Sequence, residues 1–288
     1  MKKLVLQLEG VSLAYGDVQA LDHVSLELGA GETAVILGAA GSGKTVLLKT
    51  SVGLLKPDSG RVYLFDEEIK ALKESALADL RSRVGILFQE GALFDSLTVE
   101  ENVSYPLENQ QSLLKQLKMA RKERGAAVAE VVDDGEIGAR VREALRFVEL
   151  EETLDKFPSE LSGGMRRRVG IARAVVTRPE LLLYDSPTAG LDPITANTIV
   201  RLILKERDLR NAATMLVTHR YQDGHLMANF RYNPSSGEIE GGARGEASQL
   251  TTKFVVMREG CLVFEGSQAE LRAQTDSYIR KFSIHDSR

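Results

Sequence analysis

The sequence has one cysteine, no tryptophan and no long apolar run among its 288 residues. Because Cys261 has no second cysteine to pair with, an internal disulfide is excluded and we expect a reducing compartment. No apolar stretch approaches the roughly 18 residues that a membrane-spanning helix needs, so a partner must supply any connection to a membrane. Alternating Leu4, Leu6 and Leu8 follow the N-terminal lysines, a pattern that predicts a strand and not a signal peptide.

An excess of positive charge is also missing. The chain has 37 Lys and Arg against 41 Asp and Glu, a net charge of −4. This balance argues against a protein that coats nucleic acid. The hydrophobic share of 43% and the charged share of 27% are typical of globular proteins, so we expect an ordinary core in one large or two small domains.

Continuous apolar runs predict the central strands of an α/β fold. Such runs are typical of parallel strands that are buried on both faces, with helices between them. They are TAVIL (33–37), VGILF (84–88), LLLYD (181–185) and TMLVT (214–218). The first 30 residues instead alternate apolar and polar side chains, which favours an antiparallel sheet. Near the C-terminus, KFVVM and CLVFE predict a hairpin, and Ser267 with Glu270 predicts a capped helix.

Two stretches have the composition of insertions. In residues 108–142 a positive cluster, Lys115–Arg124, precedes acidic residues. We predict a solvated, charged helical excursion there, with a binding patch as the alternative. Residues 231–252 are rich in Gly, Ser and Pro, which predicts a loop or a partly disordered segment.

The run GAAGSGKT (38–45) fits the phosphate-binding pattern G-x-x-x-x-G-K-[ST] and follows a predicted strand. Its glycines let backbone N–H groups turn toward phosphate oxygens, and the next helix adds its positive end. Lys44 is expected to reach the β- and γ-phosphates of ATP, and Thr45 to bind Mg²⁺. The strand before and the apolar helix after disfavour a chance glycine-rich turn. The candidate ATP-binding residues here are Gly38, Ala39, Ala40, Gly41, Ser42, Gly43, Lys44 and Thr45.

Asp185 ends the run LLLYD at the carboxyl edge of the predicted sheet, where open α/β folds bind ligands. We expect it to hold Mg²⁺ through water beside Thr45. The alternative is an aspartate that only caps the next turn.

Residues 161–193, LSGGMRRRVGIARAVVTRPELLLYDSPTAGLDP, resemble the ATP-binding subunits of ABC transporters. Ser162 can open a helix whose N–H groups bind an anion. The resemblance implies that this anion is the γ-phosphate on another subunit, so that a homodimer or an ABC heterodimer shares two ATP molecules. The signature residues are Leu161, Ser162, Gly163 and Gly164.

Further positions match the family in order. Tyr15 resembles the aromatic residue that stacks on adenine, although a tyrosine that packs on the sheet is the alternative. Gln89 looks like the glutamine that senses Mg²⁺ and the γ-phosphate. Asp192, with Leu191, looks like the loop that faces the other subunit. His219 resembles the switch histidine that contacts the γ-phosphate, and its position after TMLVT favours that role over a structural one.

The resemblance implies a P-loop NTPase fold of the ABC ATPase type over residues 1–272. Its core is a mostly parallel sheet, with an N-terminal antiparallel β subdomain and a helical subdomain inserted at about 90–178. A loop insertion is expected at about 229–252 and a C-terminal tail at 273–288.

The segment LFQEGALFDSLTVEENVSYPL (87–107) and LSGGMRRRV resemble the ATPases of Mla/MCE-type, or Mkl-like, lipid transport systems. Amino-acid importers are the nearest alternative. The resemblance implies an integral membrane permease and an MCE-type substrate-binding protein as partners, no nucleic acid, and a cytoplasmic location on the inner face of the membrane. The permease would dock on apolar residues, unless these belong to the core: Leu93, Phe94, Leu97 and Val99.

The chain departs from the family at Ser186, where relatives have the glutamate that acts as general base. Losing a positioned base costs about 10²–10⁴ in rate, or roughly 3–5.5 kcal/mol of barrier. A serine hydroxyl has no useful basicity, although it can orient a water. Gln89, His219 or the phosphate itself could take part of the load, and ATP and Mg²⁺ binding need not suffer.

Three functions follow. The first is a transporter ATPase with slow hydrolysis or a substitute base. The second is an ATP-gated regulatory clamp, or the degenerate half of a heterodimer. A separate hypothesis is that the serine was introduced by engineering to trap ATP. The third is a soluble ABC ATPase acting on nucleic acid or ribosomes, which the acidic balance and the single ATPase unit argue against.

Overall fold

The computed structural model describes residues 3–122, 134–241 and 252–283. The chain divides into two compact units, Met1–Leu72 with Glu180–Arg288, and Lys73–Pro179. Parts of both stretches with the composition of insertions, and the last residues of the predicted tail, lie outside the described residues.

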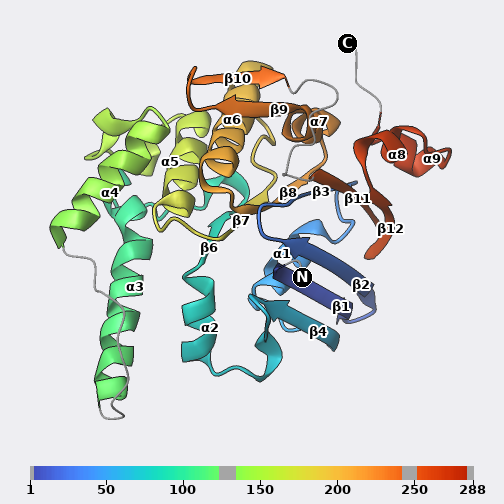
Figure 1. Ribbon diagram of the computed structural model, residues 1–288, viewed down its shortest axis with the longest axis horizontal. Coiled ribbons are helices and arrows are strands. Elements are labelled where there is room, and N and C mark those ends of the chain that lie inside the picture. Colours follow the sequence, from blue (N-terminus) through green and yellow to red (C-terminus); the bar gives the residue numbers. More distant parts are fainter. Residues whose placement is uncertain (1–2, 123–133, 242–251, 284–288) are drawn as a thin grey trace. The chain divides into compact units, whose positions relative to one another are not determined.

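The first unit is built on a mixed sheet in the order β12-β11-β3-β8-β7 (Figure 1). Strands β11, β3, β8 and β7 run parallel to their neighbours, and β12 pairs antiparallel with β11 at the edge. The predicted parallel core and the terminal hairpin are therefore confirmed. The bounds are β3 Thr33–Gly38, β7 Leu181–Asp185, β8 Ala213–Thr218, β11 Thr252–Arg258 and β12 Cys261–Gly266.

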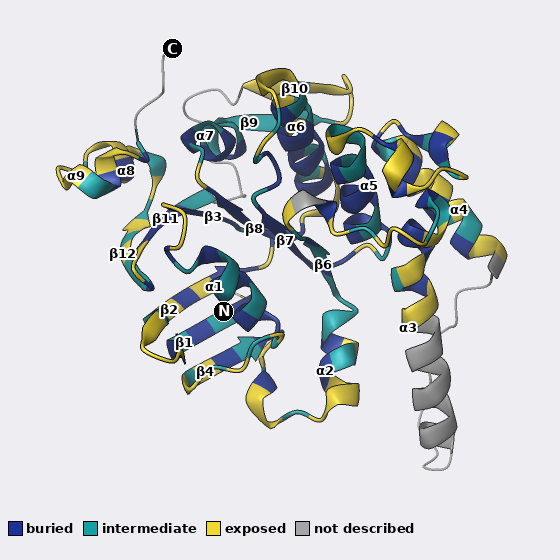
Figure 2. Ribbon diagram, turned by 180° about the vertical axis from the view of Figure 1, so that it is seen from behind, coloured by how far each residue is buried: buried dark blue, intermediate teal, exposed yellow. Residues whose placement is uncertain are grey.

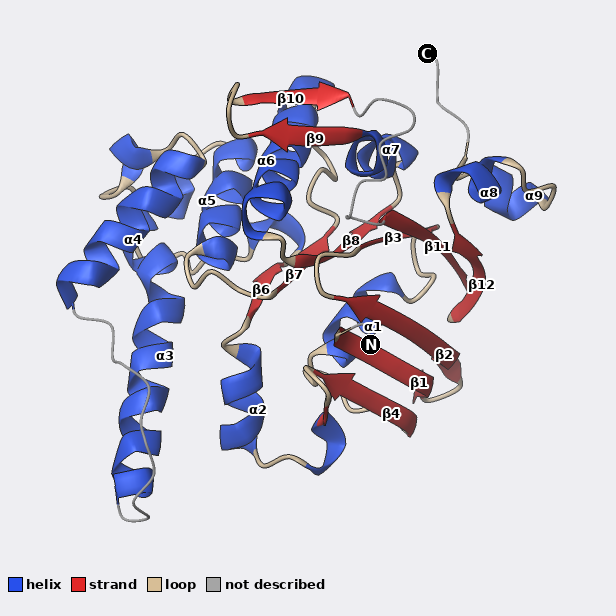
Figure 3. Ribbon diagram, in the orientation of Figure 1, coloured by secondary structure: helices blue, strands red, loops and turns tan. Residues whose placement is uncertain are grey.

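Helices on both faces bury the centre of this sheet. Every residue of β3, β7 and β8 is buried (Figure 2). Helix α1 (Lys44–Ser51) contacts these three strands from one face, and α7 (Tyr221–Asn229) contacts β3, β8 and β11 from the other (Figure 3). Since full burial of a Val, Leu or Ile side chain contributes about 1.5–3 kcal/mol, the strands that carry Gly38 and Asp185 are firmly fixed.

A separate antiparallel sheet, β2-β1-β4-β5, makes up the N-terminal part of the unit, as the alternating pattern predicts. Leu6 and Leu8 of β1 are buried, and the strand ends at the exposed Tyr15. The bounds are β1 Leu4–Tyr15, β2 Val18–Gly29, β4 Ser59–Leu64 and β5 Glu67–Glu68, and the 3₁₀ helix Ile69–Ala71 follows.

The prediction of a loop from residue 231 is wrong for its first part, which forms a hairpin of β9 (Phe230–Asn233) and β10 (Glu238–Gly241). Contacts with α6 (Pro193–Arg210) explain the difference. The fully buried Arg207 donates to the carbonyl oxygens of Met227 at 2.5 Å and Phe230 at 3.0 Å. Because these acceptors lie 20 and 23 residues away in the sequence, no local pattern announces the hairpin.

The second unit is mainly helical (Figure 3). It begins at Lys73, before the predicted limit near residue 90, because α2 contacts α3, and β6 contacts α5. The helices are α2 Glu74–Arg81, α3 Val99–Lys122, α4 Asp134–Phe147 and α5 Gly163–Val175, with β6 at Val84–Leu87 and 3₁₀ helices at Gln89–Gly91, Glu151–Thr153 and Pro158–Glu160.

Strand β6 differs from the prediction, since its residues alternate between intermediate and buried. Val84 and Ile86 line a hollow of about 340 Å³ together with residues of α2, α3 and α5, and this hollow leaves one side of the strand half-covered. The side chains of the positive cluster at 115–124 lie outside the described residues. In the described part of the chain, no helix has both the length and the apolar character to cross a membrane.

Candidate functional site

The phosphate-loop sequence forms a sharp turn between β3 and α1. Gly41 and Gly43 have φ values of +77° and +101°, in the left-handed region that favours glycine. A Cβ atom on Gly43 would lie 2.4 Å from the carbonyl oxygen of Ala20, so only glycine fits. The first N–H groups of α1 have no acceptor within the helix. The turn therefore presents donors and the positive helix end, an arrangement suited to an anion.

Lys44 is nearly buried, with 9% of its surface exposed, and turns into its own loop. Its Nζ donates to the carbonyl oxygens of Gly38 (2.9 Å) and Ala39 (2.7 Å) and to Ser42 Oγ (3.2 Å). Burial lowers the pKa of Lys44, against the opposing charge of Asp185. Phosphate oxygens could replace these neutral acceptors and would stabilise the buried positive charge.

Asp185 is 2% exposed and accepts two hydroxyl hydrogen bonds. Thr45 Oγ1 donates to Oδ2 at 2.8 Å, and Ser186 Oγ donates to Oδ1 at 3.1 Å. A hydroxyl and a carboxylate oxygen side by side are ligands that Mg²⁺ accepts, since it completes its shell with waters and substrate phosphates. The residues present therefore fit Mg²⁺.

Ser186 sits in a constrained backbone. Its φ is +50°, and its N–H donates to the carbonyl oxygen of Val217 at 2.8 Å, which fixes it between β7 and β8. After donating to Asp185, the hydroxyl keeps its acceptor lone pairs for a water. This position can therefore orient a water, but it supplies no base.

Sequence reasoning missed Asp223 in the first turn of α7. Its side chain is 1% exposed, and Oδ2 accepts hydrogen bonds from Thr188 Oγ1 (2.6 Å) and Thr218 Oγ1 (2.7 Å). Burial raises the pKa of Asp223, although both hydroxyl groups oppose the shift. The carboxylate thus joins the loop after Asp185 to the strand end that precedes the exposed His219. No spacing signal could reveal this contact, because Thr188 and Asp223 are 35 residues apart.

Two further candidates of the first unit lie at the ends of elements. Tyr15 is 53% exposed at the end of β1, so its ring is accessible. Asp192 caps α6, and its carboxylate accepts from the N–H groups of Ile194 and Thr195, both at 3.0 Å. A side-chain hydrogen bond with Thr195 is the main cause that lowers the pKa of Asp192. Within the unit, hydrogen bonds join Thr45, Asp185 and Ser186.

The remaining candidates lie in the second unit. Gln89 is exposed at the start of its 3₁₀ helix. Ser162 caps α5 and accepts from the N–H of Met165 at 3.2 Å, so the helix begins where the sequence predicts. Gly163 and Gly164 form its first turn, and Leu161 is buried.

The predicted docking residues divide between surface and core. Phe94 is 42% exposed and packs on Tyr105, with 4.8 Å between ring centroids. The guanidinium of Arg173 lies 5.7 Å from the Phe94 ring centroid. Val99 is fully buried, while Leu93 and Leu97 are half-buried. Phe94 and Tyr105 therefore form an accessible aromatic pair, and Val99 belongs to the core.

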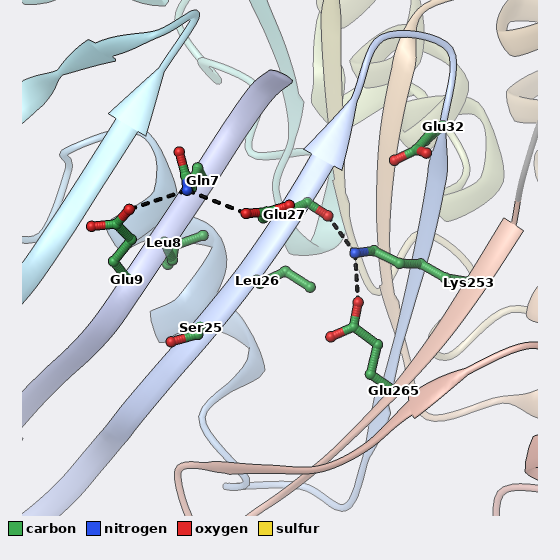
Figure 4. Close-up of a pocket in the computed structure, with 9 residues that line it drawn as sticks. All are labelled: Gln7, Leu8, Glu9, Ser25, Leu26, Glu27, Glu32, Lys253 and Glu265. Carbon is green, nitrogen blue, oxygen red and sulfur yellow. Dashed lines mark hydrogen bonds and ion pairs between the residues drawn. The ribbon is translucent and has the colours of Figure 1, made fainter. Parts of the chain in front are cut away.

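A hollow of about 580 Å³ lies elsewhere in the first unit and contains no predicted site residue (Figure 4). The Lys253 ammonium donates to the carbonyl oxygen of Glu27 and, at 2.7 Å, to Glu265 Oε1. These contacts join β11 to β2 and β12, so we assign the hollow a structural role. Its lining residues are Gln7, Leu8, Glu9, Ser25, Leu26, Glu27, Glu32, Lys253 and Glu265.

Comparisons with known proteins agree on one family. The family model described as ABC transporter matches residues 21–189. The probable ribonucleotide transport ATP-binding protein mkl of Mycobacterium leprae (strain TN) is 34% identical over 216 residues, which cover 75% of this chain and 57% of the relative. The methionine import ATP-binding protein MetN 2 of Bacillus cereus (strain ATCC 10987 / NRS 248) is 38% identical over 202 residues, covering 70% and 54%. The chain thus spans little more than half the length of these two relatives.

A solved structure extends the likeness to the fold. The ATP-binding cassette MJ0796, in a dimeric post-hydrolysis state bound to ADP and Pi, superimposes with a TM-score of 0.69 at 27% identity. The alignment covers 91% of this chain and 98% of that cassette.

Proposed function

This chain belongs to the ABC transporter family, and we propose that it is an ATP-binding subunit that dimerises on Mg-ATP and drives a membrane permease. The observation that carries the proposal is the phosphate loop with Lys44 inside it and the Thr45–Asp185 pair beside it. The relatives named as transport and import ATP-binding proteins support the transport role. The dimeric MJ0796 cassette supports assembly in pairs.

The phosphate-loop residues would bind the triphosphate through backbone N–H groups and the charge of Lys44. Thr45 and Asp185 would hold Mg²⁺, and the bound ion would neutralise charge on the phosphate oxygens. Gln89 would sense the ion and the γ-phosphate, a role that rests on the family resemblance alone. Tyr15 would stack on adenine. Residues Leu161 to Gly164 of a second copy would complete the site, with Asp192 facing that copy.

Hydrolysis would be slow at this site. Ser186 can accept a hydrogen bond from the attacking water but cannot remove its proton at neutral pH. His219, exposed just after β8, would contact the γ-phosphate beside Lys44, as the family resemblance implies. An ATP-bound dimer should therefore persist longer than one with a glutamate base.

For the cargo, we propose a phospholipid or another lipid. The proposal rests on the segment 87–107, with the exposed aromatic pair Phe94 and Tyr105 as part of the permease-docking surface. An MCE-type protein would deliver the lipid, and the permease would hold the subunit at the inner face of the membrane. Co-purification from native membranes tests this: a permease with bound lipid supports it, and a permease whose transport of methionine follows ATP hydrolysis contradicts it.

A regulatory clamp is the second candidate, and Ser186 is the observation that favours it. Such a clamp would dimerise on ATP and release it unhydrolysed, or would form one half of a heterodimer. Single-turnover measurements on the assembled complex separate the two candidates, because only the transporter ATPase forms ADP at a rate that matches transport.

Lys44→Ala tests the ATP site itself. We expect this variant to lose Mg-ATP binding in titration calorimetry and to remain monomeric with ATP, because the buried positive charge of the loop is gone. Lys49→Ala, in the last turn of the same helix, is the matched control and should bind ATP like the wild type. Retained ATP affinity in a folded Lys44→Ala protein would contradict the assignment.

A further inference from the structure

The C-terminal segment reaches the phosphate loop. After β12 come α8 (Gln268–Arg272) and α9 (Ser277–Arg280). The Tyr278 hydroxyl of α9 donates to the carbonyl oxygen of Met257 at 2.8 Å and accepts from the N–H of Ala39 at 3.2 Å. Because the phenol has one proton, its donation to Met257 leaves a lone pair directed to Ala39. One hydroxyl thus bridges β11 and the first turn of the phosphate loop.

Tyr278 is held firmly at this position. Asp276 caps α9 and accepts from the N–H of Tyr278 at 2.8 Å. Phe282, which is 8% exposed, packs edge-on against the tyrosine ring at 5.2 Å between centroids. The Arg258 guanidinium also contacts the tyrosine ring, with its Cζ 5.7 Å from the ring centroid. The ring is therefore packed independently of its hydroxyl hydrogen bonds.

The peptide groups of Ala39 are held from two directions. Tyr278 accepts from its N–H, while Lys44 Nζ donates to its carbonyl oxygen at 2.7 Å. If Lys44 turns to a phosphate, Ala39 loses the lysine and keeps Tyr278. The turn after β11 also supports the loop, since the N–H of Gly260 donates to the carbonyl oxygen of Ser42 at 3.2 Å.

The same segment is fixed to the helix that follows His219. The Tyr221 hydroxyl of α7 accepts from Gln268 Nε2 and from Arg272 Nε, both at 2.8 Å. Tyr221 is two residues after His219. The segment α8–α9 therefore contacts both the phosphate loop and the first residue of α7, the helix that follows His219.

We propose that Tyr278 is a positioning residue that keeps the phosphate loop in its nucleotide-binding shape, so that the C-terminal segment sets the affinity for ATP. This inference rests on the proposed ATP-binding function. Tyr278 acts through the backbone of Ala39 and touches no reacting atom. Loss of its hydroxyl should therefore weaken nucleotide binding and leave the chemical step unchanged.

Tyr278→Phe in the full chain tests this, because it removes both hydrogen bonds and keeps the ring packing. Since two neutral hydrogen bonds are lost at a partly exposed site, we expect the dissociation constant for Mg-ATP to rise about fivefold. The KM for ATP should rise by a similar factor while kcat stays near the wild type. The unfolding temperature should fall by only a few degrees, because the two hydrogen bonds are lost and the ring packing is kept. Tyr232→Phe, in the hairpin of the same unit, is the matched control and should leave all of these values unchanged.

Two results would overturn the inference. One is unchanged ATP affinity in Tyr278→Phe. The other is a kcat that changes together with KM, which indicates a purely structural contact. Lys44→Ala separates the failures: if it loses ATP while Tyr278→Phe does not, only this inference fails, and if it retains ATP, the proposed function fails as well.

Discussion

Replacing Ser186 with glutamate should restore a general base to the site. Ser186 and glutamate both carry a Cβ, so the left-handed backbone at φ +50° strains them about equally. The change removes the hydrogen bond from Ser186 Oγ to the carboxylate of Asp185, which costs about 1.5–3 kcal/mol because the acceptor is charged. We therefore expect an unfolding temperature lowered by only a few degrees, and a protein that still folds and binds ATP.

The rate should change far more than the stability. A positioned base contributes about 10²–10⁴ to the chemical step. Because release steps limit turnover in many enzymes, we expect at least a tenfold rise in steady-state turnover for Ser186→Glu. Phosphate release from the purified subunit, alone and with its permease, measures this.

Ser186→Gln is the control for side-chain size, since it has a similar shape without the base, and it should remain as slow as the wild type. The reasoning is refuted if the Glu and Gln variants hydrolyse ATP equally fast. It is also refuted if the wild type with its permease already turns over at about 1–10 per second and the Glu variant is no faster.

Two further changes test the surroundings of the site. Burial raises the pKa of Asp223 in the folded protein above the unfolded value of about 3.9. The stability that this carboxyl group contributes is therefore complete below the unfolded pKa and is lost as the pH rises through the folded pKa. Asp223→Asn should melt higher than the wild type at pH 7 and at the same temperature near pH 4. Asp223→Ala leaves the hydroxyls of Thr188 and Thr218 without this acceptor and should lower the unfolding free energy by about 1–3 kcal/mol per hydroxyl; equal melting of the Ala and Asn variants would contradict this. Gly43→Ala should abolish ATP binding, because its Cβ would lie 2.4 Å from a backbone carbonyl oxygen of β2, whereas Gly41→Ala, with open space at its Cβ, should retain weakened binding in the same calorimetric titration.

The sequence predicts the parts of the fold that depend on local pattern. Apolar runs locate β3, β7 and β8 because strands buried on both faces need uninterrupted apolar residues. The same rule overstates the burial of β6, since a hollow beside Val84 and Ile86 is a property of the packed helices and not of the strand.

The residues of the candidate site likewise fall into those that a local motif reveals and those that depend on distant contacts. Lys44, Thr45 and Asp185 are recognisable because phosphate and metal binding impose a fixed local spacing. Asp223 and Tyr278 are not, because their importance arises from hydrogen bonds to residues 35 and 239 positions away. The β9–β10 hairpin escapes prediction for a related reason, since buried Arg207 and its carbonyl partners hold it from another helix.

The anchoring of the β9–β10 hairpin lets the segment between α7 and β11 vary in length. The carbonyl oxygen of Met227, just before β9, accepts from Arg207 and also from Thr252 Oγ1 at 3.4 Å, at the first residue of β11. Met227, near the end of α7, and Thr252, at the start of β11, are thus neighbours. Since the entropy of closing a loop grows only slowly with its length, the segment between them can lengthen or shorten without altering the register of β11 beside β3. Changes in this region can therefore accumulate while Met257, and with it the support of the phosphate loop, keeps its place.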